Sequence, residues 1–350
     1  MNLKIAAIAG DGIGPEVLAE ALPVLRLLCD QEGVDLSVDE FPFGADHYLR
    51  TGELLPDAFV GRVRDDYHAV LFGAVGDPRI RDDAYGRGIL LRLRQELDLY
   101  VNYRPYAFRA LNGLFREQPL DCVVFRENTE DVYTASGGLL SRGGRNVLAI
   151  ENAIFTREAV ERIVRSAFRH AATEGRRSVM LCDKGNAMKF AGALWREVFR
   201  DVAAEHPGIE ARHMYIDAAC MELVRDPGRF DVVVASNLFG DILSDLAAQM
   251  AGGIGFSPSA NRNPEHPHFL GLYEPVHGSA PDIAGQGLAN PAGALLSVAL
   301  LLRDHGLKTA HDRLVQAVTA TVASGLRTRD AGGQASTAAF GAAVRRQLSA

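Results

Sequence analysis

Phe230-Asp-Val-Val-Val-Ala-Ser-Asn-Leu-Phe-Gly-Asp241-Ile-Leu-Ser-Asp245 combines a β-branched run, a short turn and an amphipathic stretch. The run Val232–Ala235 predicts a buried strand, and the apolar spacing over Asp241–Met250 predicts a helix. A buried strand that leads directly into a helix is the repeating unit of α/β proteins. This segment therefore predicts that fold class, provided that the same alternation continues elsewhere in the chain.

The alternation does continue on both sides of this segment. Further predicted strands are Leu3–Ala9, Ala69–Phe72, Cys122–Arg126, Ser178–Cys182 and His213–Ile216. Further predicted helices are Pro15–Glu32, Arg157–Ala172, Gly192–Ala204, Pro291–Arg303 and His311–Ala323. We therefore predict an α/β fold with a mostly parallel open sheet.

Length and composition exclude several classes of protein. The chain has 350 residues, which favours two domains or two interleaved lobes. It carries 37 Lys and Arg against 44 Asp and Glu, so its net charge of -7 disfavours a nucleic-acid partner. The longest nearly apolar stretch, Ala292–Leu302, is about half of the ~20 residues that a membrane span needs. The four cysteines are widely spaced, and we expect free thiols in a soluble, cytoplasmic protein.

The glycine-rich segment Gly10-Asp-Gly-Ile-Gly-Pro-Glu16 follows a predicted strand and opens a helix. A dinucleotide fingerprint, Gly-x-Gly-x-x-Gly, that starts at Gly10 would need glycine where Pro15 stands. The sequence therefore predicts that this is not a Rossmann fingerprint fold, and that any NAD binds by another route.

Two carboxylates on the helix predicted over Asp241–Met250 suggest a metal site. Asp241 and Asp245 are four residues apart and lie on one helical face, about 5–6 Å apart at Cβ. Hard oxygen ligands of this kind suit Mg²⁺ or Mn²⁺. The alternative is that both acids only interact favourably with the helix N-terminus. Asp217, after a predicted strand, is a candidate third ligand.

A group of basic residues suggests an anionic substrate. Six arginines fall in one part of the chain: Arg92, Arg94, Arg104, Arg109, Arg116 and Arg126. Several of them in one pocket would suit a substrate with two or three carboxylates, although each alone also fits a solvated surface charge. Lys184 is a candidate base and Tyr133 a candidate proton donor.

Six motifs in family order give the chain a resemblance to the metal-dependent β-decarboxylating dehydrogenases. This family contains isocitrate, isopropylmalate, homoisocitrate and tartrate/D-malate dehydrogenases. The motifs are Gly10-Asp-Gly-Ile-Gly-Pro-Glu16, Leu93-Arg-Gln-Glu-Leu-Asp-Leu-Tyr100 with Arg104-Pro105, Arg126-Glu-Asn-Thr-Glu130 with Tyr133, Lys184-Gly-Asn186, Asn237-Leu-Phe-Gly-Asp-Ile-Leu-Ser-Asp245 and Glu274-Pro-Val-His-Gly-Ser-Ala-Pro-Asp-Ile-Ala-Gly285.

The resemblance implies a two-lobed isopropylmalate-dehydrogenase-like fold with the active site in the cleft between the lobes. Residues 1–99 and 253–350 would form a cofactor-binding lobe. Residues 100–252 would form a metal and dimerisation lobe, including an arm at about 134–145. From its Gly and Ser content, Thr134–Arg145 fits either such an arm or an ordinary surface loop. The family is typically homodimeric with shared active sites.

The resemblance also implies roles for particular residues. Arg94, Arg104 and Arg126 would bind the malate carboxylates, Tyr133 would protonate the product carbanion, and Lys184 would act as the base. Asp241 and Asp245 would hold Mg²⁺ or Mn²⁺, while Lys184 and Asp217 would reach into the partner subunit's site. NAD would bind to a loop that contains His277, Gly278, Ser279, Ala280, Asp282, Ile283 and Asn290. Because the Asp282 carboxylate would repel a 2′-phosphate, NAD is expected rather than NADP.

The identity of the substrate depends on the residues that precede Arg94. Leu90 and Leu91 resemble the apolar pair that isopropylmalate dehydrogenases place against the alkyl substituent. The serine and asparagine of isocitrate enzymes are absent at Gly88 and Leu90, and Arg87 matches no subgroup. We therefore predict NAD-dependent oxidative decarboxylation of 3-isopropylmalate.

Three alternatives remain open. Arg126–Tyr133 and Lys184–Phe190 are similar to isocitrate-type enzymes, which include homoisocitrate dehydrogenases. Val232–Asp245, Gly137-Gly138 and the loop Asn261–Phe269 are similar to D-malate/tartrate dehydrogenases. A non-catalytic regulatory paralogue is the alternative from a different class, and the intact motif positions disfavour it.

Overall fold

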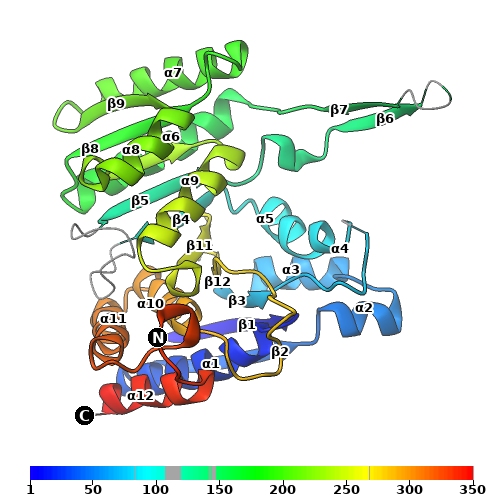
Figure 1. Ribbon diagram of the computed structural model, residues 1–350, viewed down its shortest axis with the longest axis vertical. Helices are drawn as coiled ribbons and strands as arrows, with labels where there is room; N and C mark the ends of the chain where they lie inside the picture. The colour runs from blue at the N-terminus through cyan, green and yellow to red at the C-terminus, as the bar shows by residue number, and fades with distance from the viewer. Residues whose placement is uncertain (83, 107–119, 142, 144–146, 268, 350) are drawn as a thin grey trace. The chain divides into compact units, whose positions relative to one another are not determined.

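The computed structural model describes residues 1–82, 84–106, 120–141, 143, 147–267 and 269–349. The chain divides into two units (Figure 1). Unit 1 comprises Met1–Leu99, Arg104–Leu120 and Ala247–Ala350, and unit 2 comprises Tyr100–Tyr103 and Asp121–Leu246. These units differ from the expected lobes at residues 104–120 and 247–252, which are grouped with unit 1.

Unit 1 is built on a mostly parallel set of strands. They are β1 (Asn2–Gly10), β2 (Asp35–Phe41), β3 (Ala69–Ala74), β11 (Pro258–Arg262) and β12 (Gly271–Pro275). Their order is β2-β1-β3-β12-β11. The pairs β1–β2, β1–β3 and β3–β12 are parallel, whereas β11–β12 is antiparallel. The predicted α/β fold with a mostly parallel sheet is thus confirmed.

Helices contact these strands and one another. They are α1 (Gly14–Gln31), α2 (Ala45–Thr51), α3 (Asp57–Asp66), α4 (Ala84–Gly86), α5 (Arg92–Glu96), α10 (Ala292–Asp304), α11 (Lys308–Ala323) and α12 (Thr337–Ser349). One turn of π-helix, Arg87–Leu91, joins α4 to α5. Helix α10 is buried almost all round because it packs against β11 and β12 as well as α1 and α11.

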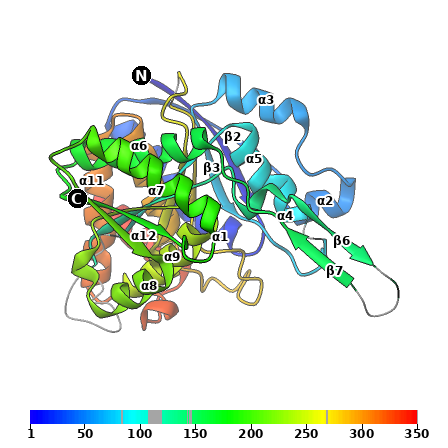
Figure 2. The ribbon, with the colours of Figure 1, turned by 90° about the horizontal axis from the view of Figure 1, so that it is seen from above.

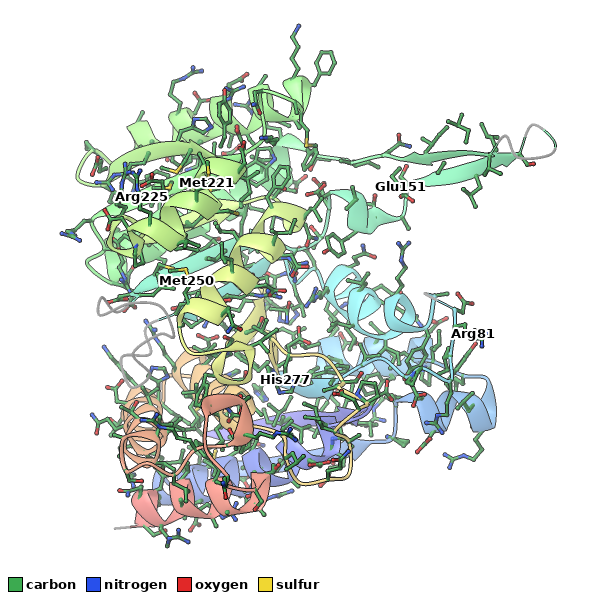
Figure 3. All side chains as sticks on the ribbon, in the orientation of Figure 1. Arg81, Glu151, Met221, Arg225, Met250 and His277 are labelled. Carbon is green, nitrogen blue, oxygen red and sulfur yellow. The ribbon has the colours of Figure 1, made fainter. Side chains whose placement is uncertain are left out.

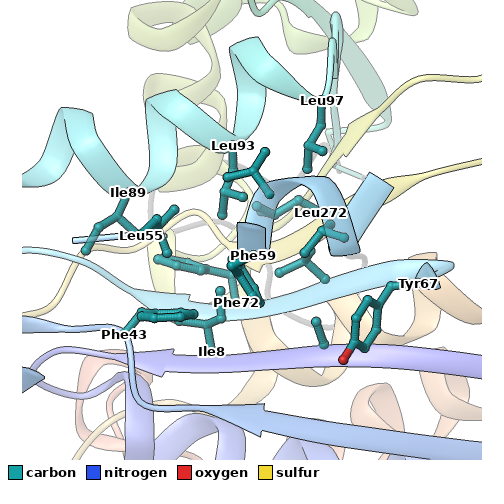
Figure 4. Close-up of a cluster of buried hydrophobic side chains, with 14 of the residues drawn as sticks. Ile8, Phe43, Leu55, Phe59, Tyr67, Phe72, Ile89, Leu93, Leu97 and Leu272 are labelled. Atoms are coloured by element: carbon teal, nitrogen blue, oxygen red, sulfur yellow. The ribbon is translucent and has the colours of Figure 1, made fainter. Parts of the chain in front are cut away.

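A hydrophobic cluster joins α3 and α5 to the strands of unit 1 (Figure 4). Phe59 of α3 and Leu93 of α5 meet Phe72 of β3 in this cluster, and all three side chains are at most 4% exposed. Fully burying a side chain of this size contributes about 1.5–3 kcal/mol to the free energy of folding. This packing fixes α5, and with it the π-turn, on the sheet.

Unit 2 has its own parallel strands. They are β5 (Cys122–Glu127), β8 (Ser178–Asp183), β9 (Glu210–Tyr215) and β10 (Val232–Ala235), in the order β5-β10-β8-β9. Strand β4 (Val101–Tyr106) is divided between the units after Tyr103. The helices are α6 (Arg157–Thr173), α7 (Lys189–Ala204), α8 (Ile216–Arg225) and α9 (Asn237–Met250). Helices α6 and α7 run side by side (Figure 2).

A two-stranded hairpin extends from unit 2. Strands β6 (Gly137–Ser141) and β7 (Val147–Glu151) pair antiparallel, and they point away from the other strands of unit 2 in both ribbon views (Figures 1 and 2). Every residue of both strands is exposed, including Leu139, Leu148 and Ile150. The segment Thr134–Arg145 that was expected to form an arm includes β6, although Arg142 and Arg145 lie outside the described residues.

Two predicted elements differ from the structure. The strand predicted over His213–Ile216 is instead Glu210–Tyr215, and Ile216 begins α8. The β-branched side chain of Ile216 is buried on a helix, where tertiary packing outweighs its preference for strands. Asn261, expected in an irregular loop, ends up in β11, where its amide donates to the carbonyl of Leu272 at 3.1 Å. His268, in the same loop Asn261–Phe269, lies outside the described residues.

Within the described residues, no helix is long and apolar enough to cross a membrane. Three cysteines are buried, Cys220 is half-buried, and all four are free thiols in the described part of the chain. Burial raises the pKa of the Cys122 thiol to about 12, so this thiol is protonated at neutral pH.

Candidate active site

In unit 2, a buried guanidinium lies at the carboxyl end of a parallel strand. Arg126 is the second-to-last residue of β5 and is 2% exposed. Its Nε donates to Asn237 Oδ1 at 2.8 Å, and its Nη1 donates to Asp241 Oδ1. Tyr133 Oη donates to the other oxygen of Asp241 at 3.0 Å, and its ring lies 5.2 Å from the Arg126 guanidinium. The structure therefore brings together Arg126, Tyr133 and Asp241.

Backbone features hold this group in place. A Cβ on Gly240 would lie 2.7 Å from Arg126 Cβ, so only glycine lets the first turn of α9 approach β5 this closely. Asp131 is buried, has a φ of 72°, and accepts from the Leu238 amide of α9 at 3.0 Å. A non-glycine residue with positive φ stores strain, and such residues cluster at functional sites.

The second carboxylate of α9 also matches the sequence pattern. Asp245 lies one turn after Asp241, where its side chain is exposed. Within the described part of the chain, no group of three or more His, Cys, Asp or Glu side chains is close enough together to hold a metal ion. Asp217, the third candidate ligand, instead accepts from Lys184 Nζ at 2.7 Å.

Lys184 and Asp217 form their own pair in unit 2. Lys184 follows β8 directly, and Asp217 is in the first turn of α8. The lysine ammonium donates to Asp217 and holds the pKa of that carboxyl below its usual range. The Asp217 side chain is 60% exposed, so the pair is open to solvent. Because Asp217 is exposed and Lys184 is partly exposed, the pair can exchange protons with water.

In unit 1, Arg94 is a buried basic residue. It lies on α5, is 5% exposed, and donates from Nη2 to Glu274 Oε1 at 2.8 Å. Asn261 Nδ2 donates to the same oxygen at 2.8 Å. Among the described residues, the buried Arg94 Nε has no hydrogen-bond partner. An unpaired N–H of this kind is costly unless an anion accepts from it.

The residues beside Arg94 lie on the π-turn. Leu90 and Leu91 are half-buried, and Leu90 packs against the cluster of Figure 4. Arg87, at the start of this turn, is exposed. Arg104 is buried on β4, whereas Arg109 and Arg116 lie outside the described residues. Single π-turns within helices are rare and occur frequently at functional sites.

The loop expected to bind NAD is fixed by the glycine-rich turn after β1. The Ile13 amide donates to the Ser279 carbonyl at 2.8 Å. Glu16 of α1 accepts from the amides of Gly285 and Gly287. A Cβ on Gly12 would lie 1.9 Å from the Ser279 carbonyl oxygen, and Gly12 has a φ of +57°. The turn therefore positions this loop through backbone contacts.

Side chains of the same loop differ in their exposure. His277, labelled in Figure 3, is buried, and its Nδ1 lies 3.0 Å from the Gly278 carbonyl. Burial lowers the His277 pKa, so the ring is neutral at pH 7 and Nε2 is an acceptor without a partner in the described structure. Gly278 and Asp282 are exposed, Ala280 and Ile283 are half-buried, and Asn290 caps α10 through the Ala292 amide at 3.0 Å.

Sequence reasoning missed several residues that organise these groups. Glu274 binds Arg94, and Asn261 donates to Glu274. Glu16 and Asp11 accept from backbone amides of unit 1 loops. Asp11 and Glu16 belong to the segment Gly10–Glu16 and Glu274 begins the last motif, so the signal was present. No role could be assigned to these residues from the sequence, because their hydrogen-bond partners are distant in sequence.

The comparisons identify the family. The family model described as "Isocitrate/isopropylmalate dehydrogenase" matches residues 4–344. The chain therefore belongs to the isocitrate/isopropylmalate dehydrogenase family, as the motifs predicted. Its membership implies NAD or NADP and a divalent metal.

Individual members of the family are similar to this chain over almost its whole length. The chain is 46% identical to the 3-isopropylmalate dehydrogenase of Thermobifida fusca over 91% of its own length and 90% of that protein. It is also 46% identical to the 3-isopropylmalate dehydrogenase of Clavibacter michiganensis, over 99% of its own length and 98% of that protein. Among solved structures, isocitrate dehydrogenase from Methylococcus capsulatus superposes with a TM-score of 0.90 at 35% identity, covering 99% of both chains.

Proposed function

We propose that this protein is a 3-isopropylmalate dehydrogenase that oxidises and decarboxylates its substrate with NAD. The observation that carries this proposal is the apolar pair Leu90 and Leu91 on the turn that leads into Arg94. The 46% identity to relatives named 3-isopropylmalate dehydrogenase supports the same substrate. Its isopropyl group is apolar and would contact the leucines, while its two carboxylates need basic partners.

The arginines are proposed to bind and orient the substrate. Arg94 and Arg126 are buried and already hold carboxylates, Glu274 and Asp241 respectively. Arg104 is buried as well and would act with them. Buried guanidinium groups bind carboxylates in a fixed orientation, which aligns the substrate for reaction.

Proton transfers are assigned to Lys184 and Tyr133. Lys184 would first pass its ammonium proton to Asp217 or to solvent. When C2 loses its hydride to NAD, the neutral Lys184 amine would then take the hydroxyl proton, and a β-keto acid results. After CO₂ leaves, the Tyr133 hydroxyl gives a proton to the carbon that carried it. Tyr133 lies beside Arg126, which would bind a carboxylate of the same substrate. We also propose that Lys184 and Asp217 serve the partner subunit's site.

The donor chemistry of α9 fits a divalent metal. Asp241 and Asp245 offer hard oxygen atoms one helical turn apart, which suits Mg²⁺ or Mn²⁺. Arg126 and Tyr133 both donate to Asp241, which keeps its carboxylate in place on α9. A bound divalent ion would polarise the substrate carbonyl and stabilise the enolate formed when CO₂ leaves.

The loop His277–Asn290 is proposed to hold NAD, which makes unit 1 the cofactor unit. The unpaired His277 Nε2 is a buried acceptor that suits the amino group of an adenine ring. The exposed Asp282 carboxylate can accept from a ribose 2′-hydroxyl and would repel a 2′-phosphate.

Replacing Asp282 with Lys together with Ile283→Tyr should therefore change the cofactor preference. We expect the ratio of kcat/KM for NADP to that for NAD to rise at least about tenfold, because repulsion of the phosphate becomes attraction. Steady-state kinetics with both cofactors measure this ratio. Gln286→Lys, a neutral-to-basic change in the same loop, is the control. An unchanged ratio in the double variant would exclude the role assigned to Asp282.

The reaction itself is tested by its stoichiometry. Purified protein with Mn²⁺, NAD and 3-isopropylmalate should form one NADH and one CO₂ for each substrate molecule consumed. NADH without CO₂ would remove the decarboxylation step from this proposal, and formation of neither product would overturn it.

We further propose that the protein forms homodimers in the cytoplasm, where its free thiols would stay reduced. Apolar side chains lie exposed on α8 and α9: Met221, labelled in Figure 3, is 67% exposed, Val224 45% and Ile242 52%. The hairpin adds Leu139 at 74%. Contiguous exposed apolar patches are typical of protein interfaces, and we propose that these side chains form one in the dimer.

Met221→Glu combined with Val224→Glu should weaken this dimer. A charge buried in an apolar interface costs several kcal/mol, so we expect the mass in sedimentation to fall from dimer to monomer. Leu49→Glu, an exposed leucine on α2 of unit 1, should leave the mass unchanged. A wild-type monomer, or a double variant that still sediments as the dimer, would contradict the assignment of this surface.

A further inference from the structure

One buried carboxylate in unit 1 links four segments that are distant in sequence. Asp11, in the turn after β1, is 5% exposed. Its Oδ1 accepts from the Ala45 amide at the start of α2 at 2.6 Å. Its Oδ2 accepts from the Gly76 amide after β3 at 2.7 Å and from Tyr85 Oη of α4 at 2.7 Å. Burying a carboxylate is costly unless hydrogen bonds satisfy its oxygens, and these three donors do so for Asp11.

The same turn contacts the loop proposed to hold NAD. Asp11 is followed by Gly12 and Ile13, whose backbones contact Ser279, with the Ile13 amide 2.8 Å from the Ser279 carbonyl. Gly76, whose amide Asp11 holds, is also close to this residue, because a Cβ there would lie 3.2 Å from Ser279 Oγ. Any shift of Ser279 is thus transmitted directly to the residues around Asp11.

On the other side, Tyr85 connects Asp11 to the turn that carries the apolar pair. Tyr85 is two residues before Arg87, where the π-turn begins, and its ring is 4% exposed in the hydrophobic cluster of Figure 4. Ile89 and Leu93, on the π-turn and α5, belong to this cluster. The Tyr85 hydroxyl is a polar anchor at the start of this segment, and Arg92 and Arg94 make polar contacts at its other end.

We propose that Asp11 and Tyr85 are positioning residues that couple the loop His277–Asn290 to the segment Ala84–Glu96. Binding of the dinucleotide fixes Ser279 and the Gly10–Gly14 turn, and Asp11 then fixes Tyr85 and the leucine pair. The inference rests on the functions proposed for the loop and for Leu90 and Leu91. It predicts that the dinucleotide tightens substrate binding through the hydrogen bond between Tyr85 and Asp11.

Tyr85→Phe tests this coupling, and the chain supplies a matched control. Tyr67 lies in the same cluster, is 1% exposed, and donates to Asp39 Oδ2 at 2.6 Å. Tyr67→Phe therefore also removes one hydroxyl-to-carboxylate hydrogen bond from this core. Both substitutions should reduce thermal stability to a similar, small extent.

Hydrogen exchange with and without NADH is the first readout, because it needs no substrate. In wild type and in Tyr67→Phe, NADH should slow exchange over both 277–290 and 84–96. In Tyr85→Phe it should slow exchange over 277–290 alone. Steady-state kinetics are the second readout: KM for isopropylmalate should rise about fivefold in Tyr85→Phe with kcat within about twofold, because the substrate site is less ordered.

Asp11→Asn should give the same pattern more strongly. The asparagine NH₂ group cannot accept a hydrogen bond, so it would leave the backbone N–H of either Ala45 or Gly76 without an acceptor. The outcomes separate this inference from the proposed function. Protection of 277–290 without 84–96 in wild type, or equal effects of Tyr85→Phe and Tyr67→Phe on KM, would overturn the coupling and leave the function standing. If NADH protects neither segment, the cofactor assignment fails and the coupling fails with it.

Discussion

Asp245→Asn should lower kcat at least about a hundredfold while the protein stays folded, because a carboxylate ligand carries much of a divalent site's affinity. Asp245 is exposed on α9, so the amide fits without repacking. Titration of the activity with Mn²⁺ should show a much higher metal requirement, and thermal unfolding without metal should stay near that of wild type.

Asp201→Asn is the matched control for this substitution. Asp201 also lies on a helix of unit 2, is half-exposed, and pairs with Arg157 at 3.0 Å. Its loss removes a surface ion pair, which contributes at most about 1 kcal/mol. An Asp245→Asn enzyme with the wild-type Mn²⁺ titration would show that Asp245 does not bind the metal.

Arg94→Lys should lower kcat/KM for isopropylmalate by about a hundredfold, because lysine cannot reproduce the planar fork of a guanidinium. The ammonium can still neutralise the buried Glu274, which Asn261 also binds, so the fold should survive. What is lost is the Nε donor, which is unpaired among the described residues and which we assign to a substrate carboxylate.

Arg92→Lys separates this effect from a general loss of positive charge on α5. Arg92 is two residues away, pairs with Glu96 and Asp57, and is more exposed than Arg94. Its replacement should leave kcat/KM within about twofold, as expected for a surface ion pair. Equal losses in the two variants would contradict the role assigned to Arg94.

The sequence predicted the strands and helices with strong periodicity, because their patterns are local. Val232–Ala235 is a strand as predicted, and the helix predicted over Asp241–Met250 is the main part of α9. Short helices such as α2 and α5 were missed, since their stability comes from packing on the hydrophobic cluster rather than from their own sequence. The same reason explains Ile216, whose side chain favours a strand in isolation.

The candidate site was predicted unevenly for a similar reason. Asp241 and Asp245 could be proposed as a pair from the sequence because both lie on one helix, one turn apart. Glu274 was missed because it is 180 residues from Arg94, and only the fold makes them neighbours. Asp11 stood in a segment that was tested for a nucleotide fingerprint, yet its three donors come from three other segments. Long-range polar contacts of this kind leave no periodic trace in a sequence.

The central claim is tested most directly by NADH absorbance for purified protein with Mn²⁺ and NAD, with 3-isopropylmalate, D-malate, tartrate, isocitrate and homoisocitrate in parallel. We expect kcat/KM for 3-isopropylmalate to exceed that of every other substrate by about a hundredfold, because an apolar pocket discriminates by the alkyl surface it buries. A preference for D-malate, tartrate or either tricarboxylate would contradict the role assigned to Leu90 and Leu91.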